Sequence, residues 1–217
     1  MTEETYKSIP EPTLRRLPSY HRYLKGLAAR KRPVVSCSRI GEELGLDPTQ
    51  VRKDLGYTGI IGTPKVGYPV DALIEAIEEF LGWTNANEGL LVGVGSLGTA
   101  LLGFERFNTY GLHIVAAFDN DAAKIGTTVH GRDVLPMEKF VRLATRIHAL
   151  VGIIAVPAEH AQTTANLMMQ AGIRAIWNLA PVPLVVPPTV IVQQDDLFAS
   201  LAVLTQKLSA RLKSERV

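Results

Sequence analysis

Three glycines, at positions 93, 95 and 98, follow the apolar run Leu90-Leu91-Val92 and precede a stretch of helical character. Without a Cβ, glycine lets the backbone turn tightly and approach a ligand closely. The spacing Gly-x-Gly-x-x-Gly between a strand and a helix therefore suits the backbone to hold a pyrophosphate against free amides at a helix N-terminus. The candidate cofactor-binding turn consists of Gly93, Val94, Gly95, Ser96, Leu97 and Gly98.

Asp119 supplies the second part of this candidate site. It ends the next apolar run, residues 113–118, about 20 residues beyond the last glycine,. A carboxylate at that distance accepts hydrogen bonds from the hydroxyls of the adenosine ribose. Because a carboxylate also repels a 2′-phosphate, the pattern predicts NADH and NAD as ligands in preference to NADP(H). The alternative for the glycine pattern alone is a structural turn that binds no ligand.

Two further segments are expected near the nicotinamide half of the ligand. An apolar run over residues 150–156 ends at Pro157, and another over 173–179 contains Asn178. Ligands of open parallel sheets bind beyond the carboxyl ends of the strands, so Pro157 and Asn178 are predicted site residues. The alternation of apolar runs and helical stretches over residues 89–195 predicts an α/β fold, a Rossmann-type doubly wound parallel sheet.

A second group of residues with possible chemistry lies on a predicted helix near the N-terminus. Asp47 is expected to cap this helix, and Val51 and Leu55 are expected to face inward,. Glutamine and arginine can each form two hydrogen bonds with one base edge, whereas lysine suits phosphate contacts. Lys65, at the tip of a presumed hairpin, is predicted to reach an adjacent backbone or minor groove. The outward-facing side chains of the helix are Thr49, Gln50, Arg52 and Lys53.

The residues around this helix predict a winged helix-turn-helix domain. Apolar residues recur at helical spacing over 14–28, where Pro18 is expected either to kink the helix or to begin its second part,. Further helices are expected over 38–44, from Pro48, and over 70–81, with short β runs around a Gly/Pro turn within 56–68. The alternative is a small helical domain that binds another protein.

The charge distribution favours nucleic acid as the partner of this first part. Residues 1–70 hold 12 Lys and Arg against 7 Asp and Glu, whereas residues 71–217 hold 11 against 14. A basic N-terminal part on a neutral-to-acidic body is typical of DNA-binding proteins, although many basic faces are only solvated. We predict three segments: a winged helix DNA-binding domain (1–82), a Rossmann NAD(H)-binding domain (83–195) and a C-terminal dimerisation helix (196–217).

Composition argues against several classes of protein. No apolar run approaches the ~20 residues that cross a bilayer, and the first residues are polar and acidic rather than a secretory signal,. A cytoplasmic location without a membrane partner is therefore expected. Cys37 is the only cysteine in the sequence, so neither an intramolecular disulfide nor a Cys-x-x-Cys metal site can form,. No His/Asp/Glu spacing predicts a metal site.

Catalytic residues are difficult to identify. The sequence has no Tyr-x-x-x-Lys pair, and His160, which follows Pro157, is the only plausible catalyst among the histidines beyond residue 90. A binding fold without chemistry, joined to a DNA-binding domain, indicates a sensor rather than an enzyme. Two other classes stay open: an NAD-dependent oxidoreductase with a helical appendage, and a nucleotide-binding interaction module with no DNA role.

The chain resembles the Rex family of bacterial redox-sensing repressors from about Ile9 to Leu212. The resemblance implies a homodimer that binds operator DNA, expected to be an inverted repeat, and is released when NADH binds, while NAD⁺ competes weakly or permits binding. It also implies that the last helix, residues 196–212, is exchanged between subunits. Seven blocks in order carry the resemblance: Leu17-Pro18-Ser19-Tyr20, Gln50 to Leu55, Lys65-Val66-Gly67-Tyr68, Gly93 to Gly98, Phe118 to Asp121 with Lys124-Ile125-Gly126, Val156-Pro157, and Asn178 to Pro181.

The resemblance further implies a ligand-dependent contact among an arginine on the first helix, an aspartate at the start of the last helix and a tyrosine after the glycine turn. Arg22 and Asp196 match the first two positions. Phe104 stands at the tyrosine position, so any hydrogen bond from that ring is lost. The last helix also carries an apolar stripe, for which packing within one chain is the alternative to exchange: Leu197, Leu201, Leu204 and Leu208,.

Overall fold

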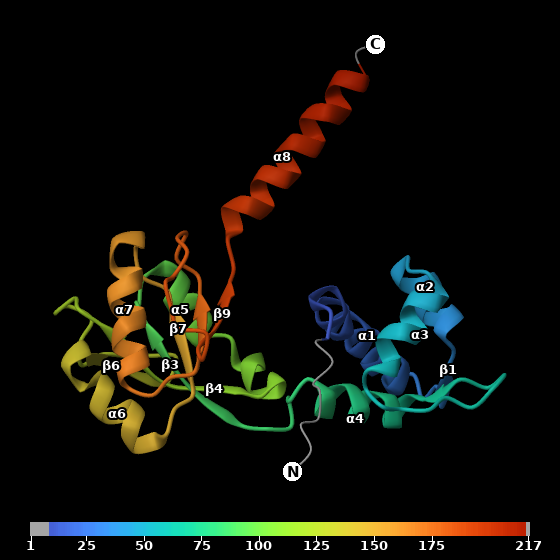
Figure 1. The fold of residues 1–217 in the computed structure, drawn as a ribbon, viewed down its shortest axis with the longest axis horizontal. Coiled ribbons are helices and arrows are strands. Elements are labelled where there is room, and N and C mark those ends of the chain that lie inside the picture. The colour runs from blue at the N-terminus through green and yellow to red at the C-terminus, as the bar shows by residue number, and fades with distance from the viewer. Residues whose placement is uncertain (1–8, 216–217) are drawn as a thin grey trace. The chain divides into compact units, whose positions relative to one another are not determined.

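The computed structural model describes residues 9–215 of the chain (Figure 1). Its contacts divide the chain into two units, the first ending at Asn85 and the second beginning at Ala86. The boundary predicted between residues 82 and 83 lies three residues earlier. Each unit has its own buried core, and each is described by itself below.

The first unit is built from four helices and two short strands of the described residues. Local sequence explains the helix ends. The Ser36 hydroxyl accepts a hydrogen bond from the Arg39 amide at 3.1 Å, and Asp47 Oδ1 accepts one from the Thr49 amide at 2.7 Å,. Gly45, with φ 65°, ends the second helix in the left-handed conformation,. The elements are α1 (Glu11–Ala29), β1 (Val34–Val35), α2 (Cys37–Leu44), α3 (Pro48–Gly56), β2 (Tyr68–Pro69) and α4 (Val70–Phe80).

Two features of this unit differ from expectation. α1 is one helix that passes through Pro18, so no separate second helix begins there. The predicted hairpin is reduced to a single antiparallel bridge, in which the backbones of Thr63 and Gly67 exchange hydrogen bonds of 2.8 and 2.9 Å. Tyr68 pairs instead with Val35 of β1. Residues 63–67 form a short loop closed by this bridge, and we call this loop the wing.

The second unit is organised by a sheet of seven strands within the described residues, in the order β5-β6-β4-β3-β7-β8-β9 (Figure 1). All neighbours pair in parallel except β5 and β6. The chain starts at β3, builds one side and then crosses to β7, so β3 lies at the topological switch point. The strands are β3 (Asn87–Val92), β4 (Leu112–Asp119), β5 (Thr128–Val129), β6 (Arg132–Pro136), β7 (Val151–Ile154), β8 (Ala175–Asn178) and β9 (Ile191–Gln194).

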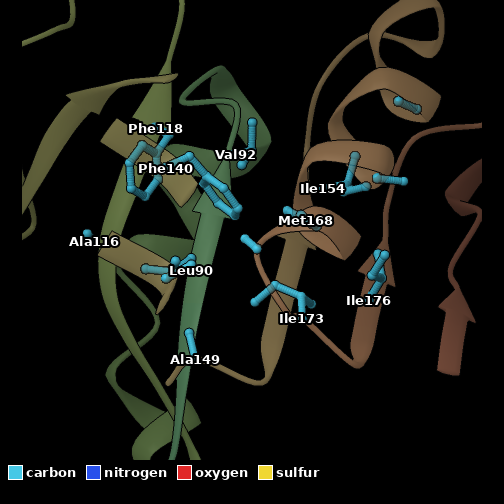
Figure 2. Packing of buried hydrophobic residues seen from close by; sticks show 14 of the residues in the cluster. Leu90, Val92, Ala116, Phe118, Phe140, Ala149, Ile154, Met168, Ile173 and Ile176 are labelled. Carbon is cyan, nitrogen blue, oxygen red and sulfur yellow. The ribbon is translucent and has the colours of Figure 1, made fainter. Parts of the chain in front are cut away.

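Helices cover both faces of this sheet, as the doubly wound prediction requires. One core contains residues of α6 and α7, and Figure 2 shows its Phe118 and Phe140 rings next to each other, with centroids 4.9 Å apart. The other core contains Leu102 of α5. The helices are α5 (Ser96–Leu102), η1 (Glu105–Tyr110), η2 (Met137–Lys139), α6 (Phe140–Ile147), α7 (Ala158–Gln170) and α8 (Leu197–Ser214).

The stretch of helical character expected after the glycine turn, over residues 99–107, is not one continuous helix. α5 ends at Leu102, and the 3-10 helix η1 starts at Glu105 after a break at Gly103 and Phe104. A Cβ on Gly103 would lie 3.0 Å from Nε2 of His130, a tight contact, and glycine is itself a poor helix former,. His130 lies in the turn of the β5–β6 hairpin, an element that the sequence pattern did not predict.

The last helix, α8, begins one residue later than expected because Asp196 is its N-cap, and it ends at Ser214. Its apolar side chains are exposed in the single chain: Phe198 is 70% exposed and Leu204 is 63% exposed. Within residues 9–215, no helix combines the length and apolar character that crossing a membrane requires.

Candidate functional site

The glycine turn between β3 and α5 requires glycine at two positions for packing reasons alone. Gly93 has φ 99°, and a Cβ there would lie 2.5 Å from the Ala155 carbonyl oxygen. A Cβ on Gly98 would lie 1.9 Å from the carbonyl oxygen of Gly93. Both distances are far below van der Waals contact, so Gly93 lets the turn approach the end of β7 and Gly98 lets α5 pack against the turn and β3.

Gly95 differs from the other two glycines because nothing lies within 4 Å of the position that its Cβ would occupy. The open space belongs to a cavity of about 480 Å³ at the carboxyl ends of the central strands. Gly95 precedes α5, and no side chain caps the first amides of that helix. Those amides are therefore available to a ligand that passes over Gly95.

Asp119 lies at the end of β4 and lines the same cavity. Its Oδ2 accepts hydrogen bonds from the Val94 amide at 2.8 Å and from Lys124 Nζ at 3.2 Å, and its Oδ1 accepts one from the Asp121 amide at 2.9 Å. Burial by itself raises the pKa of Asp119, but these hydrogen bonds outweigh it and lower the pKa below its ordinary value,. The group is therefore a carboxylate at neutral pH, as a ribose-binding acceptor must be.

Pro157 also lines the cavity, whereas Asn178 does not. Asn178 is fully buried, and its side chain stabilises the loop that follows β8. Its Nδ2 donates to the Val182 carbonyl at 2.8 Å and to Gln194 Oε1 at 2.6 Å, and its Oδ1 accepts from the Ala180 amide at 3.1 Å. A cofactor contact from Asn178 stays a prediction, and its side-chain geometry is that of a structural residue.

The other predicted residues of the turn contribute backbone rather than cavity walls. Val94 and Gly98 are buried, and Ser96 and Leu97 are exposed beside the turn. Sequence reasoning missed Lys124 as a partner of Asp119, and it missed several other wall residues, among them Met137 and Thr164. His160 lines the cavity too. Lys124 stands in one of the blocks that carry the family resemblance, and this was its signal in the sequence.

The predicted DNA-binding residues lie on α3 and the wing. Thr49, Arg52 and Lys53 are exposed. Arg52 and Lys65 line one recess of about 430 Å³ between α3, the start of α2 and the wing, so the fold brings these two cations together. Gln50 is half-buried, because its Nε2 donates a 2.9 Å hydrogen bond to Asp54 Oδ1.

Asp54, which sequence reasoning did not single out, joins α3 to α1. Its side chain is fully buried and its two oxygens accept four further hydrogen bonds. They come from Thr13 Oγ1 at 2.9 Å, Arg16 Nε at 2.6 Å, Arg16 Nη2 at 2.8 Å and Tyr20 Oη at 2.6 Å. Burial alone would raise the pKa of Asp54, but these donors lower it to about 2,. A buried carboxylate therefore holds the proposed recognition helix in place.

The three predicted coupling residues fall in different units. Arg22 is exposed on α1 of the first unit. In the second unit, Phe104 is 60% exposed, and Asp196 Oδ1 caps α8 by accepting hydrogen bonds from the Phe198 amide at 2.8 Å and the Ala199 amide at 3.3 Å. A contact between Arg22 and Asp196 stays a prediction.

Each of the two units matches a known family model. Residues 8–56 match the family model described as "Putative DNA-binding protein N-terminus", and residues 84–182 match the "CoA binding domain" model. The redox-sensing transcriptional repressor Rex of Treponema denticola is 47% identical over 193 residues, covering 89% of this chain and 92% of the relative. The protein of the same name from Bacteroides thetaiotaomicron is 42% identical over 201 residues, covering 93% and 91%.

The fold of this chain is similar to solved structures over nearly its whole length. The crystal structure of RSP in complex with β-NAD⁺ and operator DNA has a TM-score of 0.87 at 30% identity and covers 96% of this chain and 99% of that one. RSP in complex with β-NADH has a TM-score of 0.86 at 29% identity, covering 97% and 99%. RSP itself is described as a Rex-family repressor.

Proposed function

This chain belongs to the Rex family of redox-sensing transcriptional repressors, and on that premise we propose how its two units perform redox-dependent repression. A homodimer binds operator DNA through residues 1–82 of each chain. NADH binds in the Rossmann-type unit and releases the DNA, so that repression follows the ratio of NADH to NAD⁺.

The observation that carries the proposal is the cavity that Gly95 and Asp119 line together. The pyrophosphate of NADH passes over Gly95, where a side chain would stand in its way. A carboxylate has about four acceptor positions, and Asp119 uses three of them within the protein. The fourth accepts a ribose hydroxyl, while the negative charge disfavours the 2′-phosphate of NADPH.

The first unit contacts DNA mainly through cationic side chains on α3 and on the wing. Arg52 and Lys53 bind base edges and phosphates from the helix, and Lys65 binds the backbone from the wing. Thr49 adds a hydroxyl at the start of the helix. Gln50 has a smaller part than its sequence position suggests, because one of its N–H groups is committed to Asp54.

Repression responds to NADH only if the ligand prefers the arrangement that does not bind DNA. A hundredfold loss of operator affinity corresponds to about 2.7 kcal/mol of differential binding, a modest share of the binding free energy of a dinucleotide. The oxidoreductase alternative does not hold, because the relatives that define the family are transcriptional repressors and not enzymes. His160 is therefore a wall residue of the cavity rather than a catalyst.

The proposed function predicts that NADH displaces operator DNA. A duplex selected by the ligand-free protein from a randomised pool is titrated with protein at fixed salt, first without NADH and then with NADH, NAD⁺ or NADPH. We expect NADH to lower the affinity at least tenfold and NADPH to have little effect. The Arg52→Ala, Lys53→Ala double variant should bind NADH normally but lose the duplex, because its ligand site is untouched. Undiminished DNA binding at saturating NADH contradicts the sensor function.

We also propose that α8 forms the dimer by exchange between subunits and that the repressor acts in the cytoplasm, where DNA and NADH are both found. The apolar side chains of α8 support the first point. Leu201, Leu204 and Leu208 are at least half exposed in the single chain and recur on one side of the helix. Side chains of this size stabilise an assembly by roughly 1.5–3 kcal/mol each when they are fully buried.

The double variant Leu204→Asp, Leu208→Asp is therefore expected to be monomeric. Each substitution acts twice in a two-fold dimer, so the dimer dissociation constant should rise by roughly a thousandfold or more. Sedimentation equilibrium measures it. Lys207→Asp is the matched control, because it places the same charge on α8 at a position outside the stripe. A double variant that remains dimeric at micromolar concentration would exclude α8 as the dimer interface.

A further inference from the structure

The end of β8 is bonded directly to the segment that starts α8. Trp177 Nε1 donates a 2.6 Å hydrogen bond to Asp195 Oδ2, and the Asp195 amide donates a 3.0 Å hydrogen bond to the Asn178 carbonyl. Asp195 precedes Asp196, the residue that caps α8. Figure 1 shows β9 leading through this segment into α8. Trp177 thus holds the point from which α8 departs.

The other side of Trp177 contacts the segment that follows the glycine turn. Its ring packs edge to face on Phe107 of η1, with centroids 5.7 Å apart and an interplanar angle of 89°. Phe107 in turn contacts Phe104, again at 5.7 Å. Trp177 and Phe107 both pack against the core that contains Leu102, the last residue of α5. The core that contains Leu102 of α5 is therefore connected, through the rings of Phe107 and Trp177, to the carboxylate of Asp195.

Further side-chain hydrogen bonds hold the end of β9 beside β8. On the opposite side of β8, Asn178 Nδ2 donates to Gln194 Oε1 at 2.6 Å, and Gln194 Nε2 donates to the Ala180 carbonyl at 2.8 Å. These bonds fasten the end of β9 to the loop after β8. Trp177 and Asp195 are both half-buried, and the 2.6 Å hydrogen bond between them ties the position of the Asp195 carboxylate to that of the Trp177 ring.

We propose that Trp177 and Asp195 are the positioning residues through which the state of the ligand site is communicated to α8. This inference rests on the proposed release of operator by NADH. A ligand that engages the amides at the start of α5 moves α5 and the residues that follow it. The aromatic contacts carry that movement to Asp195, which shifts the first turn of α8. Phe104 acts in this series through ring contact, which needs no hydroxyl group.

The test separates ligand binding, operator binding and the coupling between them. For each variant we measure NADH affinity without DNA, operator affinity without NADH, and operator affinity at saturating NADH. The ratio of the two operator affinities is the coupling factor. Trp177→Phe keeps an aromatic ring but lacks the N–H donor, and Asp195→Ala lacks the acceptor. We expect both to leave the first two affinities within about threefold of wild type and to lower the coupling factor at least fivefold.

Two additional variants distinguish coupling from a general structural effect. Asp195→Asn keeps a side-chain acceptor and is expected to retain most of the coupling. The double variant Trp177→Phe, Asp195→Ala should couple no worse than either single variant, because both remove the same hydrogen bond. Trp83→Phe, which changes the other tryptophan of the sequence, is the matched control and should couple like wild type.

The possible failures can be told apart. If wild-type operator affinity does not respond to NADH, the proposed function and this inference are both overturned. If wild type responds and the Trp177→Phe and Asp195→Ala variants respond equally, only the inference is overturned. The same holds if Asp195→Asn loses as much coupling as Asp195→Ala, because a hydrogen bond from Trp177 would then not account for the effect.

Discussion

Replacing Asp54 with asparagine is expected to destabilise the first unit by roughly 1–3 kcal/mol and to weaken operator binding at least tenfold, because the donors to this fully buried carboxylate lose a charged acceptor,. Arg16, Tyr20 and Thr13 all donate to this carboxylate. An asparagine presents an N–H group to one of these donors, which weakens the polar contact between α3 and α1 while their shared apolar core remains. Denaturant unfolding followed by Trp83 emission, in a Trp177→Phe background, measures the change in the first unit.

The pH dependence of stability provides a second check on Asp54. Its pKa in the folded protein is about 2, against about 3.9 in an unfolded chain. A lowered pKa stabilises the folded state at pH values above the unfolded pKa, and this contribution is lost as the pH falls toward 2. In Asp54→Asn the stability should depend less steeply on pH between 4 and 2. Asp71→Asn, which changes an exposed carboxylate of α4, is the control. Equal stability of the Asp54 variant and this control would contradict the role given to Asp54.

Replacing Gly95 with alanine is expected to weaken NADH binding at least a hundredfold without loss of stability. Gly95 has φ −82°, which alanine adopts freely, and no protein atom lies within 4 Å of the added Cβ,. The methyl group therefore enters only the space that the pyrophosphate needs. Fluorescence titration with NADH measures affinity, and thermal unfolding without ligand measures stability. An alanine variant that binds NADH like wild type would show that the dinucleotide does not pass over this residue.

Gly98→Ala is the matched comparison, because it adds the same methyl group three residues further along. Its Cβ would lie 1.9 Å from the Gly93 carbonyl oxygen, so α5 must move away from β3. Overpacking of this kind costs typically 1–3 kcal/mol, and a backbone contact leaves less freedom to relax than a side chain does. This variant is expected to lose stability and NADH affinity together, whereas Gly95→Ala loses affinity alone.

The parts of the site that depend on local chemistry could be predicted from the sequence. The glycine turn and Asp119 follow a spacing rule that reflects the geometry of a strand, a tight turn and a helix, and the two units of the fold follow from the periodicity of apolar residues. The cap of α3 at Asp47 is equally local, since its acceptor and donors lie within three residues. In each case the partners are close in the chain.

The residues that sequence reasoning missed or misjudged depend on contacts between distant segments. Asp54 sits among basic residues on a predicted surface helix, but three of its partners lie 34–41 residues away on α1. The Asn178 side chain is directed to β9 by Gln194, 16 residues further along. The β5–β6 hairpin places the His130 ring next to Gly103 at the end of α5, although the two residues lie 27 positions apart. Neither propensity nor periodicity contains such pairings.

The described cores of the two units have no residue in common: one is formed by residues between Leu17 and Leu81, and the others by residues between Leu90 and Val192. A change that alters which bases are recognised therefore leaves the packing around the coenzyme intact, and the reverse holds as well. On the proposed function, substitutions on α3 and the wing move such a repressor to a new set of promoters. The redox threshold at which it acts can be adjusted separately, by mutations that never touch the DNA-binding surface.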